Sequence, residues 1–544
     1  MQRNRRNFIA ILLLACMLLT GCSGVRRAGR GAEERQSAAE NDLLRLAEFE
    51  PDTLDPQCAV DNYTVAVNVF DRLVEVGTDE AGNNTLAPSL AESWTVSQDG
   101  LVYAFRLREG VAFSNGEPLT ASDVRFTLTR LLTNPRSRHP EIAARILGAG
   151  EVLAGRATEL SGIHVIDDLN LTVTLISPDA AFLASLTSPA ASILSELATT
   201  RGGLLFGRSP EYTVGTGPFL LEEWDSGAKI TLRANADCWS GAPLCGGISI
   251  RLVTDAEAQR RLFESGELDV LDLEGVGYGA EYYIRGDVYQ DQLHKGVHVG
   301  MAFLALNEAI APLDDVRVRR AMQLALDRET LLAAIAGGRG VVETGLFPCG
   351  MTGYDQTGSA LTCDLEQARR LMNEAGYADG FNLKISVPAG GARANRELLA
   401  LVAAMWAGIG VRANVVEIDA GVFAERRSSG TLACYCENWS APYDDPAELF
   451  DMFFGSAESS RANSLCYSDE ATMRRVREAR GILNAARRME EYRALEKKLV
   501  QEDAAWVPLF SPDHYYLTSE RVRGFELPWN GGSDVCYRGV ALSD

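Results

Sequence analysis

Apolar and polar side chains alternate in residues 102–108, where the apolar positions are Tyr103, Phe105 and Leu107. An alternation with period two places apolar side chains on one face of a β-strand. Residues 114–118 then predict a turn, because Asn and Gly tolerate positive φ. Thr120 is a predicted helix N-cap, and Asp123 completes a capping box. We therefore expect a strand, a turn and a helix within residues 90–126.

The rest of the chain alternates between strand-like and helix-like patterns. Strands are predicted around 230–232, 248–252, 268–271, 303–307, 383–387, 411–418 and 506–510. Helices are predicted to begin at Asp255, at Asp314 or Asp315, at Asp327 and at Asp364, and to cover 398–406 and 491–502. Residues 248–271 and 383–418 each predict a β-α-β unit. The pattern therefore favours an α/β fold.

The amino terminus has the pattern of an export signal. Three arginines precede the apolar run 8–19, which is too short to cross a bilayer comfortably. The run ends in Leu19-Thr20-Gly21-Cys22, which resembles a bacterial lipobox. We expect residues 1–21 to be a lipoprotein signal peptide, Cys22 to carry lipid, and 22–42 to be a flexible tether. An ordinary signal peptide that contains a Cys is the alternative, and Sec or twin-arginine export is left open.

Size and charge narrow the class of protein. The chain has 544 residues, so removal of residues 1–21 leaves 544 − 21 = 523, enough for two or three domains. The formal net charge of −22 argues against a nucleic-acid partner, because phosphates would be repelled. No later apolar run is long enough to span a membrane, so we expect a soluble body outside the cytoplasm.

The chain has 11 cysteines, a high number that favours disulfides after export. Cys238 with Cys245, and Cys349 with Cys363, would close short loops and are the preferred pairs. Cys434 and Cys436 are half of a metal site in one interpretation, and one of them pairs with Cys466 in the other. Nine cysteines remain without Cys16 and Cys22, so at least one thiol is free within the molecule.

Several motifs resemble those of the extracellular solute-binding proteins of family 5, the peptide- and nickel-binding receptors of ABC importers. They are the block 90–126, 54–56, 70–74, Val214-Gly215-Thr216-Gly217-Pro218-Phe219, Asn235 with Trp239, 265–269, 306–307, 317–321 and 374–377. The resemblance covers about residues 43–526.

The resemblance implies a periplasmic-binding-protein-like clamp (type II, cluster C-like) of two α/β lobes with an additional domain. The N-terminal lobe would combine 43–80, 213–300 and 516–544. The extra domain would cover 81–212, and the C-terminal lobe 301–515. Such a clamp binds its ligand between the lobes and closes about a hinge.

The loop 437–446 bears on the ligand. Peptide-binding members have an Asp here that pairs with the peptide ammonium, and Pro442 occupies that position, so Asp444 or Asp445 is expected to replace it. Trp439 and Tyr443 resemble pocket residues of nickel-binding members, or they are a packed aromatic pair. Arg138, next to His139, resembles a pocket Arg-His pair, and Tyr63 completes the candidate ligand contacts.

We expect a lipid-anchored receptor in the periplasm or on the outer face of the cell membrane that delivers short peptides to ABC permease subunits. A nickel chelate or another small solute is the alternative ligand. Against nickel, Ala190 and Ala191 stand where a cleft arginine is expected, and the five His form no cluster in the sequence. A secreted enzyme is less favoured, because Gly-x-Ser-x-Gly, His-Glu-x-x-His and phosphate-loop motifs are absent. We expect a monomer with no cofactor and no resident metal.

Overall fold

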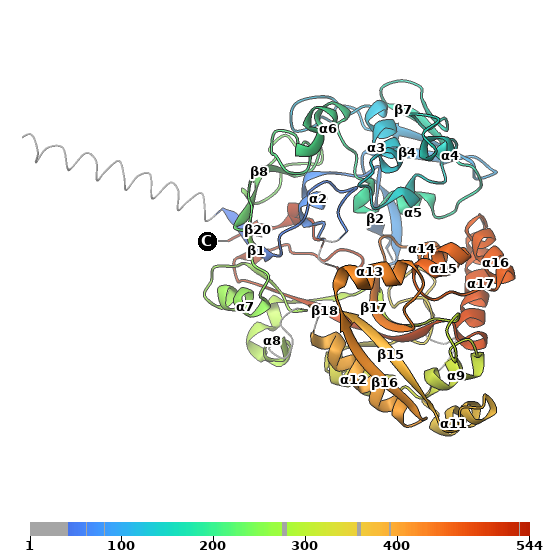
Figure 1. The fold of residues 1–544 in the computed structure, drawn as a ribbon. Helices are drawn as coiled ribbons and strands as arrows, with labels where there is room; N and C mark the ends of the chain where they lie inside the picture. Colours follow the sequence, from blue (N-terminus) through green and yellow to red (C-terminus); the bar gives the residue numbers. More distant parts are fainter. Residues whose placement is uncertain are drawn as a thin grey trace, which may run out of the picture.

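The computed structural model describes residues 42–60, 62–80, 82–274, 280–355, 361–390, 393–532 and 534–543. The expected signal peptide, the lipidated Cys22 and the tether up to residue 41 lie outside the described residues. Figure 1 shows three regions that surround a common junction. Within the described residues, no helix combines the length and apolar character that a membrane span requires.

The N-terminal lobe is built on a four-stranded sheet of order β1 (Leu43–Glu48), β10 (Gly247–Leu252), β9 (Lys229–Ala234) and β8 (Phe219–Asp225). Strands β1 and β10 are parallel, and the other pairs are antiparallel. The glycine motif before β8 packs against the end of α2 (Thr64–Val69), because a Cβ at Gly215 would collide with the carbonyl oxygen of Val69. This close approach explains the glycine at position 215.

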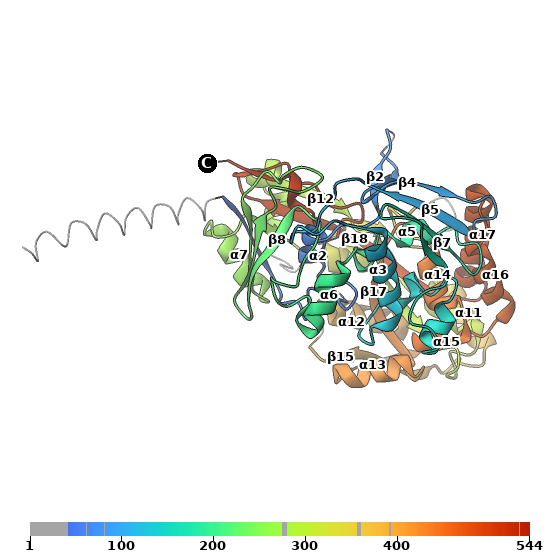
Figure 2. The same ribbon diagram turned by 90° about the horizontal axis from the view of Figure 1, so that it is seen from above.

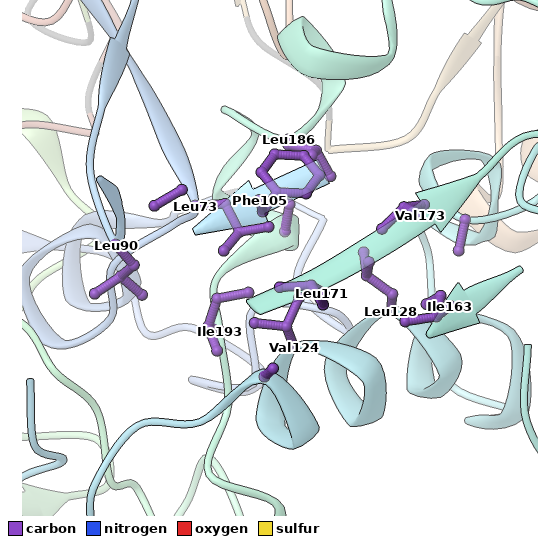
Figure 3. Packing of buried hydrophobic residues seen from close by; sticks show 14 of the residues in the cluster. Leu73, Leu90, Phe105, Val124, Leu128, Ile163, Leu171, Val173, Leu186 and Ile193 are labelled. Atoms are coloured by element: carbon purple, nitrogen blue, oxygen red, sulfur yellow. The ribbon is translucent and has the colours of Figure 1, made fainter. Parts of the chain in front are cut away.

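The extra domain contains a sheet of order β4 (Ala91–Val96), β5 (Val102–Leu107), β7 (Asn170–Thr174) and β6 (Ile163–Val165), covered by α3 (Ala121–Thr133). The predicted strand and capped helix are confirmed, and the Thr120 backbone N–H donates to Asp123 Oδ2 at 2.9 Å. Figure 3 shows Phe105, Val124, Leu128 and Leu171 within this core. Each large apolar side chain buried here contributes roughly 1.5–3 kcal/mol.

The C-terminal lobe contains the largest sheet, of order β11 (Val270–Asp272), β18 (Val507–Thr518), β13 (Gly300–Leu306), β17 (Cys434–Ser440), β15 (Phe381–Pro388) and β16 (Val411–Ile418). Two further strands, β12 (Leu293–Val297) and β14 (Gly340–Val342), also pair with β18. Strands β15 and β16 are parallel and are joined by α12 (Arg393–Ala407), which confirms this β-α-β unit.

The remaining described α-helices and strands are as follows. The helices are α4 (Ala149–Leu153), α5 (Phe182–Ser185), α6 (Glu196–Gly202), α7 (Ala256–Glu264), α8 (Ala280–Arg285), α9 (Val316–Leu324), α10 (Arg328–Ala336), α11 (Leu365–Glu374), α13 (Ala420–Ser428), α14 (Ala447–Phe454), α15 (Ala457–Ala462), α16 (Glu470–Arg480) and α17 (Ala485–Glu496). The strands are β2 (Val74–Thr78), β3 (Asn84–Pro88), β19 (Val522–Arg523) and β20 (Ala541–Leu542). The aspartates Asp255, Asp315, Asp327 and Asp364 cap α7, α9, α10 and α11, as the sequence predicts.

The β-α-β unit expected over 248–271 is wrong, because its two strands lie in different sheets. Strand β10 belongs to the N-terminal lobe, whereas β11 pairs with β18. Strand β12 pairs with the same part of β18 as β11 does, so the two strands occupy its two edges. The twelve residues of β18 provide these edges, and the large sheet therefore includes segments before residue 300 that were expected in the N-terminal lobe.

The expected disulfides are absent, since all nine described cysteines are free thiols. Cys238 Sγ lies 3.8 Å from the carbonyl oxygen of Thr216, and Cys245 Sγ donates to that of Gly247 at 3.5 Å. Cys466 Sγ likewise lies 3.8 Å from the Gly430 carbonyl oxygen. The predictions for Cys349 with Cys363, and for Cys434 or Cys436 with Cys466, are corrected in the same way.

Candidate functional site

A chain of polar side chains crosses the junction of the three regions. The Tyr63 hydroxyl, at the start of α2, lies 2.8 Å from His139 Nε2 of the extra domain. His139 Nδ1 lies 3.4 Å from Glu141 Oε1. On the C-terminal lobe, the Tyr443 hydroxyl donates to Glu448 Oε2 at 2.8 Å. We call these five residues the junction strip.

Electrostatics connects the two halves of the junction strip. Burial raises the pKa of the Glu448 carboxyl, and the negative charge of Glu141 on the facing domain raises it further. Burial opposes protonation of His139, but the hydrogen bonds to Glu141 and to the Ala59 carbonyl, together with the charges of Glu141 and Glu448, outweigh burial and raise the His139 pKa. The two carboxylates therefore favour a proton or another positive charge between the domains.

A second set of charged residues lies on both sides of the same junction. His514 Nε2, on β18, lies 2.8 Å from Asp272 Oδ1 and 3.5 Å from Glu274 Oε2 at the end of β11. Glu48, at the end of β1, faces this set from the N-terminal lobe, and its carboxyl feels the charge of Asp272. We call Glu48, Asp272, Glu274 and His514 the carboxylate cluster. Asp534 joins it to the junction strip by accepting the Tyr63 backbone N–H at 3.0 Å.

The carboxylate cluster is held in a protein environment that disfavours negative charge. Burial raises the pKa of Glu48 to about 7, and the charges of Asp534 and Asp272 add to the effect. The Glu274 side chain is 64% exposed, yet the surrounding protein raises its pKa as well. Burial opposes the charge of His514, but Asp272, Glu274 and a hydrogen bond to the Gly531 backbone together outweigh burial and raise the His514 pKa to about 9.

The positive charges that would neutralise this cluster are few. Among the described residues, no Arg or Lys forms a salt bridge with Glu48, Asp272 or Glu274. Among the described salt bridges, protonated His514 is therefore the cationic partner of the carboxylates in this cluster. A ligand ammonium or guanidinium would supply the charge that these carboxylates lack.

The same cluster has the donor chemistry of a metal site. Ligand atoms of Asp272, Glu274 and His514 all lie within 4.8 Å of one another, and they are the one group of three such residues in the described part of the chain. Carboxylates and imidazole suit divalent transition metals. Protonated His514 cannot ligate a metal, however, so occupancy would require the loss of its proton.

The structure gives the paired aspartates roles inside the protein. Asp445 accepts two hydrogen bonds from the guanidinium of Arg488, at 2.8 and 2.5 Å. Asp444 accepts from the Thr352 backbone N–H at 2.7 Å and from Asn84 Nδ2 at 3.0 Å. Because protein donors already occupy both carboxylates, their expected role as partners of a ligand ammonium is corrected. Asp444 instead connects the β2–β3 hairpin to the C-terminal lobe.

Two other candidate residues lie away from the junction strip. Trp439 is 7% exposed and packs in the core of the C-terminal lobe, so the alternative of a packed aromatic is the one observed. Arg138 is exposed, and its backbone N–H donates to the Gln57 carbonyl oxygen at 2.9 Å. Its neighbour His139 makes the contact to Tyr63 that brings this segment to the site.

The sequence does not identify most of the acidic residues of the site. Glu448 occupies one position of a helix with no motif around it. Glu48 lies 224 positions before Asp272, so only the fold brings the two together. The sequence gives a weak indication of two further acids of the site, because Asp272 and Glu274 directly follow a predicted strand.

Comparison with known proteins agrees with this architecture. Residues 85–461 match the family model of the bacterial extracellular solute-binding proteins, family 5 Middle. The chain is 27% identical to heme-binding protein A of Haemophilus influenzae, over 98% of both chains. It is 26% identical to the dipeptide-binding protein of Escherichia coli, over 85% of this chain and 88% of that protein.

A solved structure shows the same fold. The ABC transporter-associated periplasmic binding protein DppA from Helicobacter pylori, in complex with the peptide STSA, superimposes with a TM-score of 0.75 at 23% identity. The match covers 92% of this chain and 98% of that protein. The α/β clamp with an additional domain, expected from the sequence, is thereby confirmed.

Proposed function

Since the chain belongs to family 5 of the bacterial extracellular solute-binding proteins, we propose that it is the substrate-binding receptor of an ABC importer for short peptides. The peptide binds at the junction of the lobes, and the clamp closes over it by a hinge motion. Permease subunits then receive it. The protein acts as a monomer without catalysis, anchored through lipid on Cys22 outside the cytoplasmic membrane.

The observation that carries the peptide assignment is the excess of carboxylates at the junction. Glu48 on one lobe and Glu274 on the other have no Arg or Lys partner among the described salt bridges, and the single cation beside Glu274, His514, is shared with Asp272. A peptide ammonium would form charge-assisted hydrogen bonds with them, and these bonds are strong in a closed, dry site. The names of the dipeptide-binding relative and of the peptide complex agree with this choice.

Peptide binding would reverse the raised pKa of Glu48. The free clamp holds Glu48 at a pKa of about 7, because its charge is poorly solvated. An ammonium beside the carboxylate would lower that pKa and favour the ionised form. Peptide binding should therefore release protons from the protein near neutral pH.

A chelated metal or a porphyrin is the second candidate. The group Asp272, Glu274 and His514 favours it, and so does the name of the heme-binding relative. In this case His514 would lose its proton and serve as a ligand of the metal. The negative carboxylates would, however, repel a ligand that is itself anionic.

Native mass spectrometry of the purified full-length protein tests the assignment. We expect co-purified peptides with free amino termini, and, after unfolding and refolding, capture of dipeptides from a defined mixture. Retention of nickel or heme in place of peptides would select the second candidate. Chemical conversion of the added dipeptides would contradict a receptor without catalysis.

A further inference from the structure

Four charged residues form an ion network between the extra domain and the C-terminal lobe. Arg480 Nε donates to Asp179 Oδ1 at 2.8 Å, across the two domains. Asp451 Oδ2 accepts from Arg480 Nη1 at 2.8 Å and from Arg145 Nη2 at 2.6 Å. The extra domain supplies Arg145 and Asp179, and the C-terminal lobe supplies Asp451 and Arg480. We call them the interdomain network.

The network lies in a closely fitted interface. The side chains of Arg480 and Asp179 are 6% and 1% exposed. Next to them, the Ala180 backbone N–H donates to the Arg480 carbonyl oxygen at 3.0 Å. Ala181, from the extra domain, is completely buried in the core cluster of the C-terminal lobe. Figure 1 shows α16 and α17 on the side of the C-terminal lobe that faces the extra domain, and the view from above shows them at the same end of the molecule as β5 and β7 (Figure 2).

The same network adjoins the junction strip. Asp451 and Glu448 both belong to α14. The positive charge of Arg480 acts on Glu448 and on Tyr443, the two strip residues of the C-terminal lobe. Any separation of Arg480 from this position therefore changes the electrostatics of the site.

We propose that the interdomain network is a latch that holds the extra domain against the C-terminal lobe in the closed clamp. The inference rests on the proposed receptor function, because only a clamp that opens needs a latch. Charged groups suit a contact that must separate, since water solvates both partners once they part. A purely apolar contact between the two domains would instead leave apolar surface exposed in the open form.

Hydrogen exchange of the ligand-free, full-length protein tests the latch. The Ala180 amide is the sensor, because it bonds across the interface and is not altered by side-chain substitution. In the wild-type protein it should exchange faster than amides of the buried strand β13, through opening of the interface without global unfolding. Arg145→Gln removes one interdomain bond at a side chain that is 32% exposed, so the fold should persist.

We expect Arg145→Gln to accelerate hydrogen exchange at Ala180 about fivefold, because the variant loses one partly buried ion pair. The exchange rates of the β13 amides should stay unchanged. Asp451→Asn should act in the same direction, because it weakens the same bond. The matched control is Arg475→Gln, which breaks the 2.8 Å pair with Glu491 inside the C-terminal lobe, at side chains 40% and 30% exposed. This control should leave the Ala180 rate unchanged.

Two results would overturn the latch. The first is that the Ala180 amide and the β13 amides exchange at the same rate in the wild-type protein. The second is that Arg145→Gln and Asp451→Asn both leave the Ala180 exchange rate at the wild-type or control value. These readouts need no ligand. A failure to bind peptides would overturn the proposed function and leave the exchange result to stand alone. Unchanged exchange with normal peptide binding would overturn only the latch.

Discussion

Arg488 holds Asp445 with two parallel hydrogen bonds, from Nη1 to Oδ2 at 2.8 Å and from Nη2 to Oδ1 at 2.5 Å. The carboxylate also accepts the backbone N–H of Ala447, the first residue of α14, at 2.9 Å. The pair therefore fixes the start of the helix that carries Glu448 into the junction strip. The side chains are only 6% and 8% exposed, which makes the pair part of the lobe's interior.

Replacing Arg488 with Gln should lower the free energy of unfolding by about 3 kcal/mol, because it leaves the buried Asp445 charge without its partner. Urea denaturation followed by circular dichroism measures this change. The exposed neighbour Arg487 provides the control, and Arg487→Gln should change the stability by less than about 0.5 kcal/mol. Equal stability of the two variants would show that the Asp445 pair is not structural.

The contact between Asp444 and Asn84 should contribute a measurable coupling energy between domains. Asn84→Ala, Asp444→Ala and the double variant form a thermodynamic cycle, with unfolding free energies from urea titration. We expect a coupling of about 1 kcal/mol, typical of a hydrogen bond to a charged group that is partly exposed. Strictly additive effects would mean that the contact contributes nothing to the association of the domains.

The His514 ion pair predicts a pH dependence of stability. The His514 pKa is raised from 6.5 to about 9 in the folded protein, where Asp272, Glu274 and the Gly531 backbone together outweigh the effect of burial. A raised pKa stabilises the fold fully below pH 6.5, and this stabilisation is lost as the pH rises toward 9.

Unfolding free energies of the wild type and of His514→Gln across this pH range test the effect. The difference between the two proteins should be largest near pH 6 and should shrink toward pH 9. A difference that grows with pH would give the opposite sign and contradict the paired, protonated His514.

Cys22→Ala should release the protein from the membrane fraction, because stable anchoring needs the acyl chains that Cys22 would carry. Cell fractionation and immunoblotting measure the distribution, with Cys58→Ala as the control for loss of a thiol in the folded body. If the Cys22 variant remains in the membrane fraction, the lipobox assignment is wrong.

Local signals in the sequence predict local structure well here. Thr120 and Asp123 mark the start of α3 because a capping box is formed by residues three positions apart. The unit β15–α12–β16 follows from periodicity and short connections, which also decide its parallel pairing. Gly215 is explained by a close approach to α2, although only the structure shows which backbone atom it meets.

Long-range partners decide the features that the sequence predicts wrongly. The sequence predicts that Asp445 binds the ligand, whereas the structure pairs Asp445 with Arg488, which lies 43 positions later in the chain. Strand β11 follows β10 and α7 in the chain, but it pairs with β18. No local sequence pattern predicts this pairing. The carboxylate cluster is assembled from three separate segments, so its charge excess becomes visible only once these segments are placed in space.

Isothermal titration calorimetry with Ala-Phe and N-acetyl-Ala-Phe tests the central claim most directly, because acetylation removes only the ammonium. We predict that the wild type binds Ala-Phe at least tenfold more tightly than its acetylated form, since loss of one partner of a charge pair that closure would bury costs about 2–5 kcal/mol. Glu48→Gln and Glu274→Gln should lose most of this preference, whereas Glu222→Gln, at an exposed acid of β8, should keep it. Equal affinity for both peptides, or an unchanged preference in both junction variants, would contradict recognition of the ammonium by the carboxylate cluster.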